Sequence, residues 1–259
     1  LLFRGFAEHD GLAGFCYPSY SLYYTMSEAN AIPYEKITLN DDFSVPFDRL
    51  LKKKYDLVIL CNPNNPTGSG IPVQEIRSFL GKFKGLLVVD EAYVDFYNES
   101  ALPLVSEFDN LIVTRSFSKS YSLAGLRIGL AIAQKEIISG FLKLKDSYNV
   151  DRLAAVAALA ALQDQKYFKY STEMVRSNKD YLEERLSQLG FEIVPSKANF
   201  IFVTHPKMES SEIYARLKEK MILVRYFKGP IQEKYLRITV GTMMEIKKLA
   251  TVLAEILNG

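Results

Sequence analysis

Cysteine and histidine are scarce in this sequence, with two residues of each among 259. So few cysteines cannot build a disulfide framework, and Cys16 and Cys61 fit buried free thiols in a reducing compartment such as the cytoplasm. The scarcity of both residue types also predicts that the chain has no structural or catalytic metal site. Chemistry is therefore to be sought among lysine, arginine, acidic and hydroxyl side chains.

Long apolar runs and an excess of one charge are also missing. No apolar stretch approaches the ~20 residues that cross a membrane, and no signal-peptide pattern is visible. The formal net charge of +2 gives no reason to expect nucleic acid or an acidic membrane as a partner. With 48% hydrophobic and 24% charged residues, the chain can build a large core and a second, smaller domain.

The most informative stretch is TRSFSKSYSLAGLRIG, residues 114–129, which places an amine among phosphate-binding groups. Lys119 can form a Schiff base with an aldehyde if burial or a nearby positive charge lowers its pKa. Arg127 can supply that charge and bind a phosphate, to which the hydroxyls of Ser116 and Ser118 can also donate. A lysine beside a phosphate clamp suggests pyridoxal phosphate, although an isolated motif of this kind is more often a surface turn.

Two other buried strands run into polar residues. In GLLVVDEAYVDF, Asp90 ends an apolar strand, where it can pair with a pyridine nitrogen, and Tyr93 can reach the same ring. In DLVILCNPNNPTGSG, an apolar strand enters a proline-stiffened loop, in which Asn65 is our candidate donor to the phenolic oxygen of the cofactor. Taken singly, a helix cap or a tight turn would explain each of these residues better.

Taken together, N-P-T-G, D-E-A-Y and S-x-S-K-x-x-x-L-A-G-x-R resemble the motifs of fold type I pyridoxal-phosphate aminotransferases. Within that superfamily the wording is most similar to histidinol-phosphate aminotransferases, as in NPNNPTG, VVDEAYVDF, ANFIFV, ILVRYF and YLRITVGT. The resemblance runs along essentially the whole chain. It implies an α/β fold with a mostly parallel sheet flanked by helices in a large cofactor-binding domain, residues 1–163. A smaller C-terminal α+β domain would occupy residues 164–259.

The resemblance also implies a role for each candidate residue. Lys119 would hold the cofactor and then move a proton between the substrate and the cofactor, while Asp90 would pair with the ring nitrogen. Tyr20 matches the aromatic residue that stacks on the ring, although tyrosine-rich stretches are as often plain packing. The remaining contacts would be made to the ring oxygen by Tyr93 and Asn65, and to the cofactor phosphate by Ser116, Ser118 and Arg127.

Arg237 is a candidate substrate ligand. YLRITV alternates, so that Arg237 lies on the face opposite Leu236 and Ile238 and leaves the core side of its strand. A solvated arginine is the default explanation of such a position. The resemblance implies instead that Arg237 binds the phosphate or carboxylate of a substrate, for which its planar guanidinium is suited. Arg225 is a second candidate for the same task.

The implied reaction is a transamination of histidine biosynthesis in a homodimer, with two half-reactions. One interconverts glutamate and 2-oxoglutarate, and the other interconverts imidazole-acetol phosphate and histidinol phosphate. Alternatives are an aromatic amino-acid aminotransferase, a threonine-phosphate decarboxylase, or a non-catalytic remnant that keeps only the fold. The first residues, LLFRGFAE, suggest the middle of a helix and lack the family's preceding Gly-rich phosphate turn, so we expect a fragment.

Periodicity predicts the main helices. Residues 47–54 and 72–83 suit helices between buried strands, and residues 152–163, rich in alanine, suit a buried helix. A long amphipathic helix follows and ends at Gly190, and three strand-like runs alternate with helices after residue 191. The last helix opens with a capping box from Thr242 to Glu245.

Overall fold

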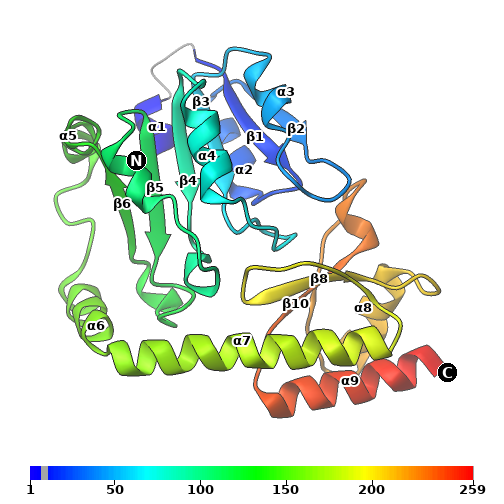
Figure 1. Cartoon of the computed structure of the whole chain (residues 1–259). Helices are drawn as coiled ribbons and strands as arrows, with labels where there is room; N and C mark the ends of the chain where they lie inside the picture. The colour runs from blue at the N-terminus through cyan, green and yellow to red at the C-terminus, as the bar shows by residue number, and fades with distance from the viewer. Residues whose placement is uncertain (7–10, 259) are drawn as a thin grey trace.

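Two sheets form the frame of the molecule, which is known from a computed structural model that describes residues 1–6 and 11–258 (Figure 1). In the described residues, one sheet has six strands in the order β2-β1-β3-β4-β5-β6, and the other has four in the order β7-β8-β10-β9. All pairs of the six-stranded sheet are parallel except β5 with β6. Its strands are β1 (Ala13–Tyr17), β2 (Tyr34–Thr38), β3 (Leu57–Cys61), β4 (Leu86–Asp90), β5 (Leu111–Ser116) and β6 (Gly129–Ala133).

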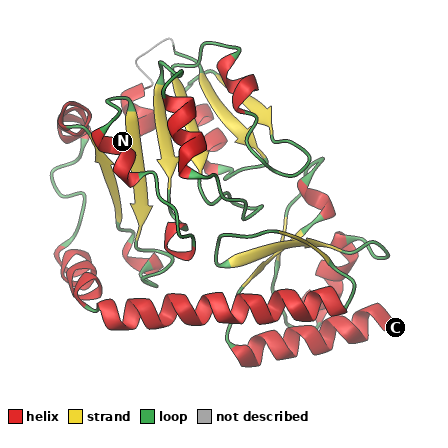
Figure 2. Cartoon of the chain, viewed as in Figure 1, coloured by secondary structure: helices red, strands yellow, loops and turns green. Residues whose placement is uncertain are grey.

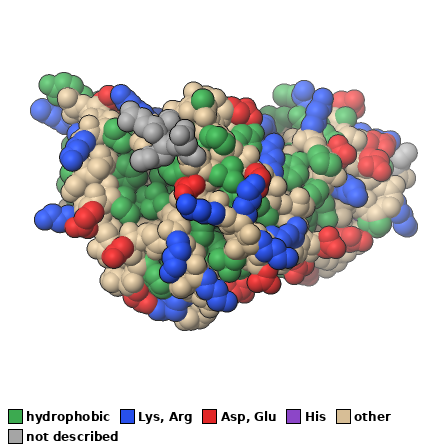
Figure 3. Space-filling model, turned by 90° about the horizontal axis from the view of Figure 1, so that it is seen from above, with side chains coloured by type: hydrophobic (Ala, Val, Ile, Leu, Met, Phe, Trp, Pro, Cys, Tyr) green, Lys and Arg blue, Asp and Glu red, His purple; other side chains and the backbone are tan. Residues whose placement is uncertain are grey.

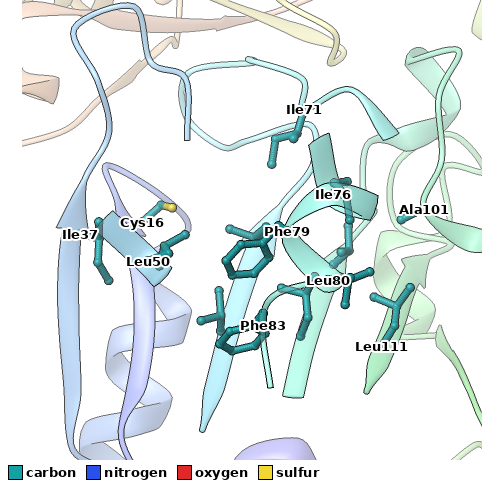
Figure 4. Close-up of a cluster of buried hydrophobic side chains, with 14 of the residues drawn as sticks. Cys16, Ile37, Leu50, Ile71, Ile76, Phe79, Leu80, Phe83, Ala101 and Leu111 are labelled. Atoms are coloured by element: carbon teal, nitrogen blue, oxygen red, sulfur yellow. The ribbon is translucent and has the colours of Figure 1, made fainter. Parts of the chain in front are cut away.

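Helices cover both faces of the six-stranded sheet, which explains why its central strands are apolar without alternation. Val58, Leu60 and Val89 point to one face, where they pack with α3 (Phe47–Leu51) and α4 (Val73–Leu80). Figure 4 shows part of this cluster, including Leu50 of α3 and Ile76 of α4. Ile59 and Val88 point to the other face. The helices on that side are α1 (Leu2–Phe6), α2 (Leu22–Ala29) and α5 (Lys135–Leu144). The expected mostly parallel sheet flanked by helices is confirmed.

The four-stranded sheet is antiparallel and has a core of its own. Leu236 and Ile238 of β10 point into this core, where they meet Leu182 of a long helix and Leu253 of the last one. The strands are β7 (Glu192–Val194), β8 (Phe200–Thr204), β9 (Arg225–Tyr226) and β10 (Leu236–Thr239), and the helices are α7 (Gln165–Gln188), α8 (Ser210–Glu219) and α9 (Met243–Asn258). Sequence reasoning missed β7, and β9 is only two residues long.

Helix α7 runs beneath both sheets and joins them (Figure 1). Near its start, Phe168 stacks on Tyr121 beside the six-stranded sheet, with ring centroids 4.6 Å apart. Near its end, Leu182 and Leu186 are buried under the four-stranded sheet. Asp164 both ends α6 (Arg152–Gln163) and caps α7. The predicted domain boundary between residues 163 and 164 falls at this joint and stays a prediction.

Most helices begin and end close to the predicted residues, but α6 corrects one expectation. The helix is present over Arg152–Gln163, yet it is largely exposed rather than buried. Leu153 is 79% exposed and Val156 is 62% exposed. An apolar face predicts that a helix is covered, but it does not tell whether the cover comes from the same chain. The capping box of α9 is confirmed, since the backbone N–H of Thr242 donates to Glu245 at 2.7 Å.

Short 3₁₀ turns lie within several of the connections between these elements, and Figure 2 distinguishes helices, strands and loops by colour. They are η1 (Val94–Phe96), η2 (Leu102–Ser106), η3 (Ala124–Leu126) and η4 (Gln232–Lys234). On the face shown in Figure 3, basic and acidic side chains are interspersed. Over residues 1–6 and 11–258, no helix is both long enough and apolar enough to cross a membrane.

Candidate active site

The candidate residues of the six-stranded sheet gather where β3, β4 and β5 end. Because neighbouring parallel strands are in register, Cys61 lies beside Asp90, and Asp90 lies beside Thr114. The loops that follow these strands therefore leave the sheet at a common edge, where ligands bind in open α/β sheets. Asn65, Tyr93 and Lys119 follow β3, β4 and β5, respectively. In Figure 1 this edge faces α7 and the four-stranded sheet.

Lys119 lies at the centre of the site. Its side chain is half-buried, and its Nζ stands 5.1 Å from the centroid of the Tyr93 ring. Burial lowers the pKa of Lys119, and the positive charges of Arg237 and Arg127 lower it further, whereas Asp90 opposes them. This is the direction that a nucleophilic amine requires. Arg237 lowers this pKa more than Arg127 does, although the sequence had pointed to Arg127.

Asp90 is held by donors on both carboxylate oxygens. The phenol of Tyr23 donates to Oδ2 at 2.6 Å, and the backbone N–H of Ala92 donates to Oδ1 at 3.1 Å. Burial raises the pKa of Asp90, while these two donors and the hydroxyl of Thr114 lower it. Sequence reasoning missed Tyr23. The available signal was its place three residues after Tyr20, in the first turn of a helix.

Asn65 and Arg237 connect the two sheets at the site. Nη1 of Arg237 donates to Oδ1 of Asn65 at 2.6 Å, which leaves the amide N–H groups of Asn65 as donors. The guanidinium of Arg237 also lies 4.9 Å from the ring centroid of Phe200. Its Nε is buried and has no hydrogen-bond partner among the described residues. Arg237 is thus half-buried rather than solvated, with a buried donor still to be satisfied.

A pocket of about 480 Å³ opens beside Arg237. Arg225 lines it as well, because Arg225 and Arg237 are directly paired across β9 and β10, and both guanidiniums lie over the ring of Phe227. The pocket lining has basic residues but no acidic one: Tyr17, Ser19, Tyr20, Ser21, Tyr24, Lys36, Asn65, Pro66, Arg225, Phe227, Lys228, Gln232 and Arg237. Such a lining suits an anionic ligand.

The predicted phosphate-binding residues occupy the turn after β5. The backbone N–H of Ser118 donates to the hydroxyl of Ser116 at 3.0 Å, and both side chains are half-buried. Arg127 is exposed and donates to the carbonyl of Ala124 at 3.1 Å. Its backbone is left-handed, with φ of 54°, an uncommon conformation for a residue other than glycine. The turn therefore brings these three residues and Lys119 to one end of β5.

Tyr20 and Tyr93 provide the aromatic surfaces of the site. Tyr20 is 39% exposed, lines the pocket and meets Tyr23 edge to face, with centroids 5.6 Å apart. Tyr93 is buried and meets Phe200 edge to face at 5.1 Å. Burial raises the pKa of Tyr93 to about 12, so its phenol stays protonated and can donate a hydrogen bond.

Glu91, next to Asp90, points away from the site into the protein. It is 1% exposed and accepts hydrogen bonds from the hydroxyl of Ser100 and the backbone N–H of Ala101. Arg115 forms an ion pair with it at 3.0 Å. Burial raises the pKa of Glu91, and the surrounding donors and Arg115 oppose that rise. This network ties the end of β4 to the end of β5.

The donor set fits pyridoxal phosphate. A half-buried amine with a lowered pKa suits an aldehyde, and a carboxylate held by donors suits a protonated ring nitrogen. The oriented amide of Asn65 and the protonated phenol of Tyr93 suit the phenolic oxygen. By contrast, the described residues contain no cluster of three or more histidine, cysteine or acidic side chains able to hold a metal ion.

Comparison with known proteins assigns the chain to a family. The model of aminotransferase class I and II matches residues 1–253, so the chain belongs to the class I and II aminotransferases. The predicted class of enzyme, its fold and its use of pyridoxal phosphate are thereby confirmed.

The relatives narrow this assignment. The chain is 41% identical over 257 residues to a histidinol-phosphate aminotransferase of Syntrophotalea carbinolica, with 98% of the chain and 73% of that protein covered. It is 42% identical to histidinol-phosphate aminotransferase 1 of Hydrogenovibrio crunogenus, with 93% and 68% covered. A solved structure of histidinol-phosphate aminotransferase from Sinorhizobium meliloti, in complex with pyridoxal-5'-phosphate, superposes with a TM-score of 0.91 at 27% identity. The match covers 99% of the present chain and 74% of the Sinorhizobium chain.

Proposed function

We propose that this protein transfers an amino group between glutamate and imidazole-acetol phosphate, producing histidinol phosphate and 2-oxoglutarate in histidine biosynthesis. The observation that carries the proposal is the pocket lined by Asn65, Arg225 and Arg237, where the two arginines are paired and the lining has no acidic residue. Relatives named for this activity, at about 40% identity, support the choice of substrate. The reverse reaction would use the same residues.

The residues at the carboxyl ends of β3, β4 and β5 would hold the cofactor. When bound, pyridoxal phosphate supplies an aldehyde that captures an amino group and a ring that accepts an electron pair. Asp90 would pair with the ring nitrogen, and Tyr20 would stack on the ring. The other contacts would be made to the ring oxygen by Asn65 and Tyr93, and to the phosphate by Ser116, Ser118 and Arg127.

Lys119 would act in two ways. Its amine, with a pKa lowered by burial and by Arg237, would attach the cofactor. After a substrate amine has replaced it, the free amine of Lys119 would remove the proton from the substrate α-carbon. It would then deliver that proton to the cofactor carbon to which the lysine had been attached. The amine lies 5.1 Å from the centroid of the Tyr93 ring, among the residues that would hold the cofactor.

Arg237 would bind the anionic group of each substrate in turn. Its Nη1 is fixed by Asn65, and its unpartnered Nε gives it a buried donor for a phosphate or carboxylate oxygen. Arg225 would add a second positive charge from the neighbouring strand. Using the same anion site for both substrates suits a reaction in which they occupy it alternately.

We also propose that the protein is a cytoplasmic homodimer. β6, α5 and α6 lie along one side of the molecule (Figure 1). These elements and the segment between α5 and α6 carry exposed apolar side chains: Leu130, Leu142, Tyr148, Val150, Leu153, Val156, Leu159 and Leu162. Exposed apolar surface of this kind favours contact with another chain. The buried free thiols Cys16 and Cys61 are compatible with a reducing cytoplasm. Val156→Glu should give monomers in sedimentation, whereas Lys166→Glu on the exposed side of α7 should not.

The test of the reaction is the visible absorption spectrum of the protein, made with every residue its gene encodes and loaded with pyridoxal phosphate. Addition of L-histidinol phosphate should convert the bound cofactor to pyridoxamine phosphate, and 2-oxoglutarate should restore it. Phosphothreonine and L-phenylalanine serve as matched amines. Conversion by phenylalanine alone would redirect the proposal to aromatic amino acids, and release of carbon dioxide from phosphothreonine would redirect it to a decarboxylase. A protein that binds no cofactor would be the non-catalytic remnant.

A further inference from the structure

We propose that Tyr23 is a positioning residue of this enzyme, which holds the Asp90 carboxylate in the orientation and the ionised form that a protonated pyridine nitrogen needs. The inference rests on the proposed function, since it concerns the same cofactor. Tyr23 lies in α2 and Asp90 ends β4, so the contact joins a helix to a strand end that are 67 residues apart in the sequence. The evidence for it is geometric.

The Tyr23 hydroxyl is directed at one oxygen of the carboxylate. It donates to Oδ2 of Asp90 at 2.6 Å, a length usual for a hydroxyl group that donates to a carboxylate. Tyr23 itself is 6% exposed and packs against Phe15 and Tyr20, with centroids 6.0 and 5.6 Å away. These contacts leave the ring little freedom to turn, so the hydroxyl fixes the plane of the carboxylate.

Asp90 has few ways to remain ionised without such a donor. The groups that face it are Tyr23, Cys61, Thr114 and Lys119, together with the backbone N–H of Ala92. Burial favours the neutral acid, and among the groups that oppose it, Tyr23 has the largest effect. Burial and the nearby Asp90 raise the pKa of Tyr23, so the phenol remains a donor rather than becoming a second anion. An ionised carboxylate has about four acceptor positions, so one remains for a ring N–H.

The neighbouring tyrosine shows that burial alone does not explain this contact. Tyr24 is 8% exposed and its phenol also donates at 2.6 Å, but the acceptor is the backbone carbonyl of Cys16. The two residues are adjacent in α2, are equally buried and make hydrogen bonds of the same length. They differ in what they hold, since one holds a candidate cofactor ligand and the other holds the backbone of β1. Tyr24 also lines the pocket beside Arg237, but its hydroxyl is directed at β1, so Tyr24→Phe is a matched control for the effect of Tyr23→Phe on cofactor binding and not on turnover.

The experiment compares the whole protein with its Tyr23→Phe and Tyr24→Phe variants. Two quantities are measured: the dissociation constant of pyridoxal phosphate, by fluorescence, and the protonation of its ring nitrogen, by ¹⁵N NMR with labelled cofactor. We expect Tyr23→Phe to weaken cofactor binding about tenfold and to move the ring nitrogen toward its unprotonated shift, because a hydrogen bond to a charged group is lost. Tyr24→Phe should leave the ¹⁵N shift in place and change the dissociation constant less than about twofold.

A second pair of variants, Asp90→Asn with and without Tyr23→Phe, tests whether Tyr23 acts through Asp90. In an Asp90→Asn background, Tyr23→Phe should change cofactor binding less than about twofold, because the charge that it positions is already gone. The proposal is overturned if Tyr23→Phe leaves the ¹⁵N shift unchanged, or if its effect on binding is undiminished in the Asp90→Asn background. Either of these results, in a wild-type protein that still binds the cofactor, would overturn only the role of Tyr23. A wild-type protein that binds no cofactor would overturn the proposed function too, so the two failures can be told apart.

Discussion

The two sheets contribute to the site in different ways. The six-stranded sheet has helices on both faces, so its polar groups follow the ends of its strands, as Asp90 and Lys119 do. The four-stranded sheet buries Leu236 and Ile238 on one face of β10, whereas its other face, which carries Arg237, turns toward the six-stranded sheet and buries Phe202 there, so Arg237 acts from within a strand. A sheet covered by helices on both faces has only its edge for chemistry, whereas a sheet that turns one face toward a neighbouring sheet can place a polar side chain on that face.

The contact between the two sheets combines specific hydrogen bonds with buried packing, since Phe202 of β8 belongs to the core cluster of the six-stranded sheet. Besides the bond from Arg237 to Asn65, the backbone N–H of Lys197 donates to the carbonyl of Gly68 at 2.7 Å. Gly68 has φ of 78°, and a Cβ atom there would collide with Ser196. Glycine is therefore required where the loop after β3 meets the loop before β8. Our proposal accordingly assigns the cofactor to the six-stranded sheet and the substrate anion to the four-stranded sheet.

The largest loss of activity should come from Lys119→Ala, which removes a residue that follows the six-stranded sheet's β5. Transamination should fall by at least about 10³-fold, because both the attachment of the cofactor and the proton transfer are lost. The fold should persist, since the side chain is only half-buried. Borohydride reduction followed by mass spectrometry checks the attachment. A reducible adduct at another lysine in this variant would disprove the assignment, and Lys143→Ala on α5 is the control.

Arg237→Ala tests the contribution of the four-stranded sheet. The Michaelis constant for histidinol phosphate should rise roughly tenfold to a hundredfold, because a charged hydrogen bond to the substrate is removed. The dissociation constant of the cofactor should change much less. Arg225→Ala, at an exposed residue, should give a smaller increase in the Michaelis constant. Equal losses of substrate and cofactor binding in Arg237→Ala would show that the two sheets do not divide the work in this way.

The bond between the sheets can be measured by a double-mutant cycle. Asn65→Ala and Arg237→Ala should be coupled by about 1–2 kcal/mol in the free energy of unfolding without cofactor, because they share one charge-assisted hydrogen bond. Denaturation by urea gives the four free energies. The pair Asn65→Ala and Arg225→Ala has no such bond among the described contacts and should be additive within about 0.5 kcal/mol. Additivity in the first pair would mean that the bond contributes nothing.

The smallest effect concerns pH. The folded pKa of Lys119 is lowered from its ordinary value of 10.5, so between the two values the unfolded chain binds more protons than the folded one. In that window, the contribution of Lys119 to the free energy of unfolding should rise with pH when cofactor is absent. Lys119→Met should therefore be more stable than the wild type at neutral pH, by a margin that narrows as pH rises. A margin independent of pH would contradict the lowered pKa.

The sequence predicted the strand ends well and the contacts between distant residues poorly. Four apolar residues before Asp90 specify a buried strand, so the place of Asp90 at the sheet edge follows from local pattern. The bond from Tyr23 to Asp90 depends on how α2 packs across β1 and β3, which no local pattern fixes. Alternation in β10 correctly predicted that Arg237 leaves the core, but only the packed structure shows it half-buried against Phe200.

Two other predictions from the sequence differ from the structure, again because a local pattern does not fix contacts with distant residues or other chains. The apolar residues of α6 predicted burial, but a helix can keep its apolar face for another chain, and the sequence pattern is then unchanged. Arg127 was expected to be the main positive charge beside Lys119, because it is near in sequence. Arg237, which is 118 residues further along than Lys119, has the larger effect on its pKa. The chemistry of Lys119, Asp90 and Asn65 followed from their residue types at strand ends, whereas the roles of Tyr20 and Arg237 came from the resemblance to a family.

Asp90 and Glu91 have an evolutionary consequence. The two acids are consecutive and chemically alike, but one faces the cofactor edge and the other is enclosed with Ser100 and Arg115. Insertion or deletion of one residue in β4 would exchange their directions, which would give the site a longer side chain and the interior a shorter one. Neither side chain would then have the right length for its surroundings. Selection on catalysis and selection on folding therefore act together on the length of β4, and they leave its length less free to drift than that of any surface loop.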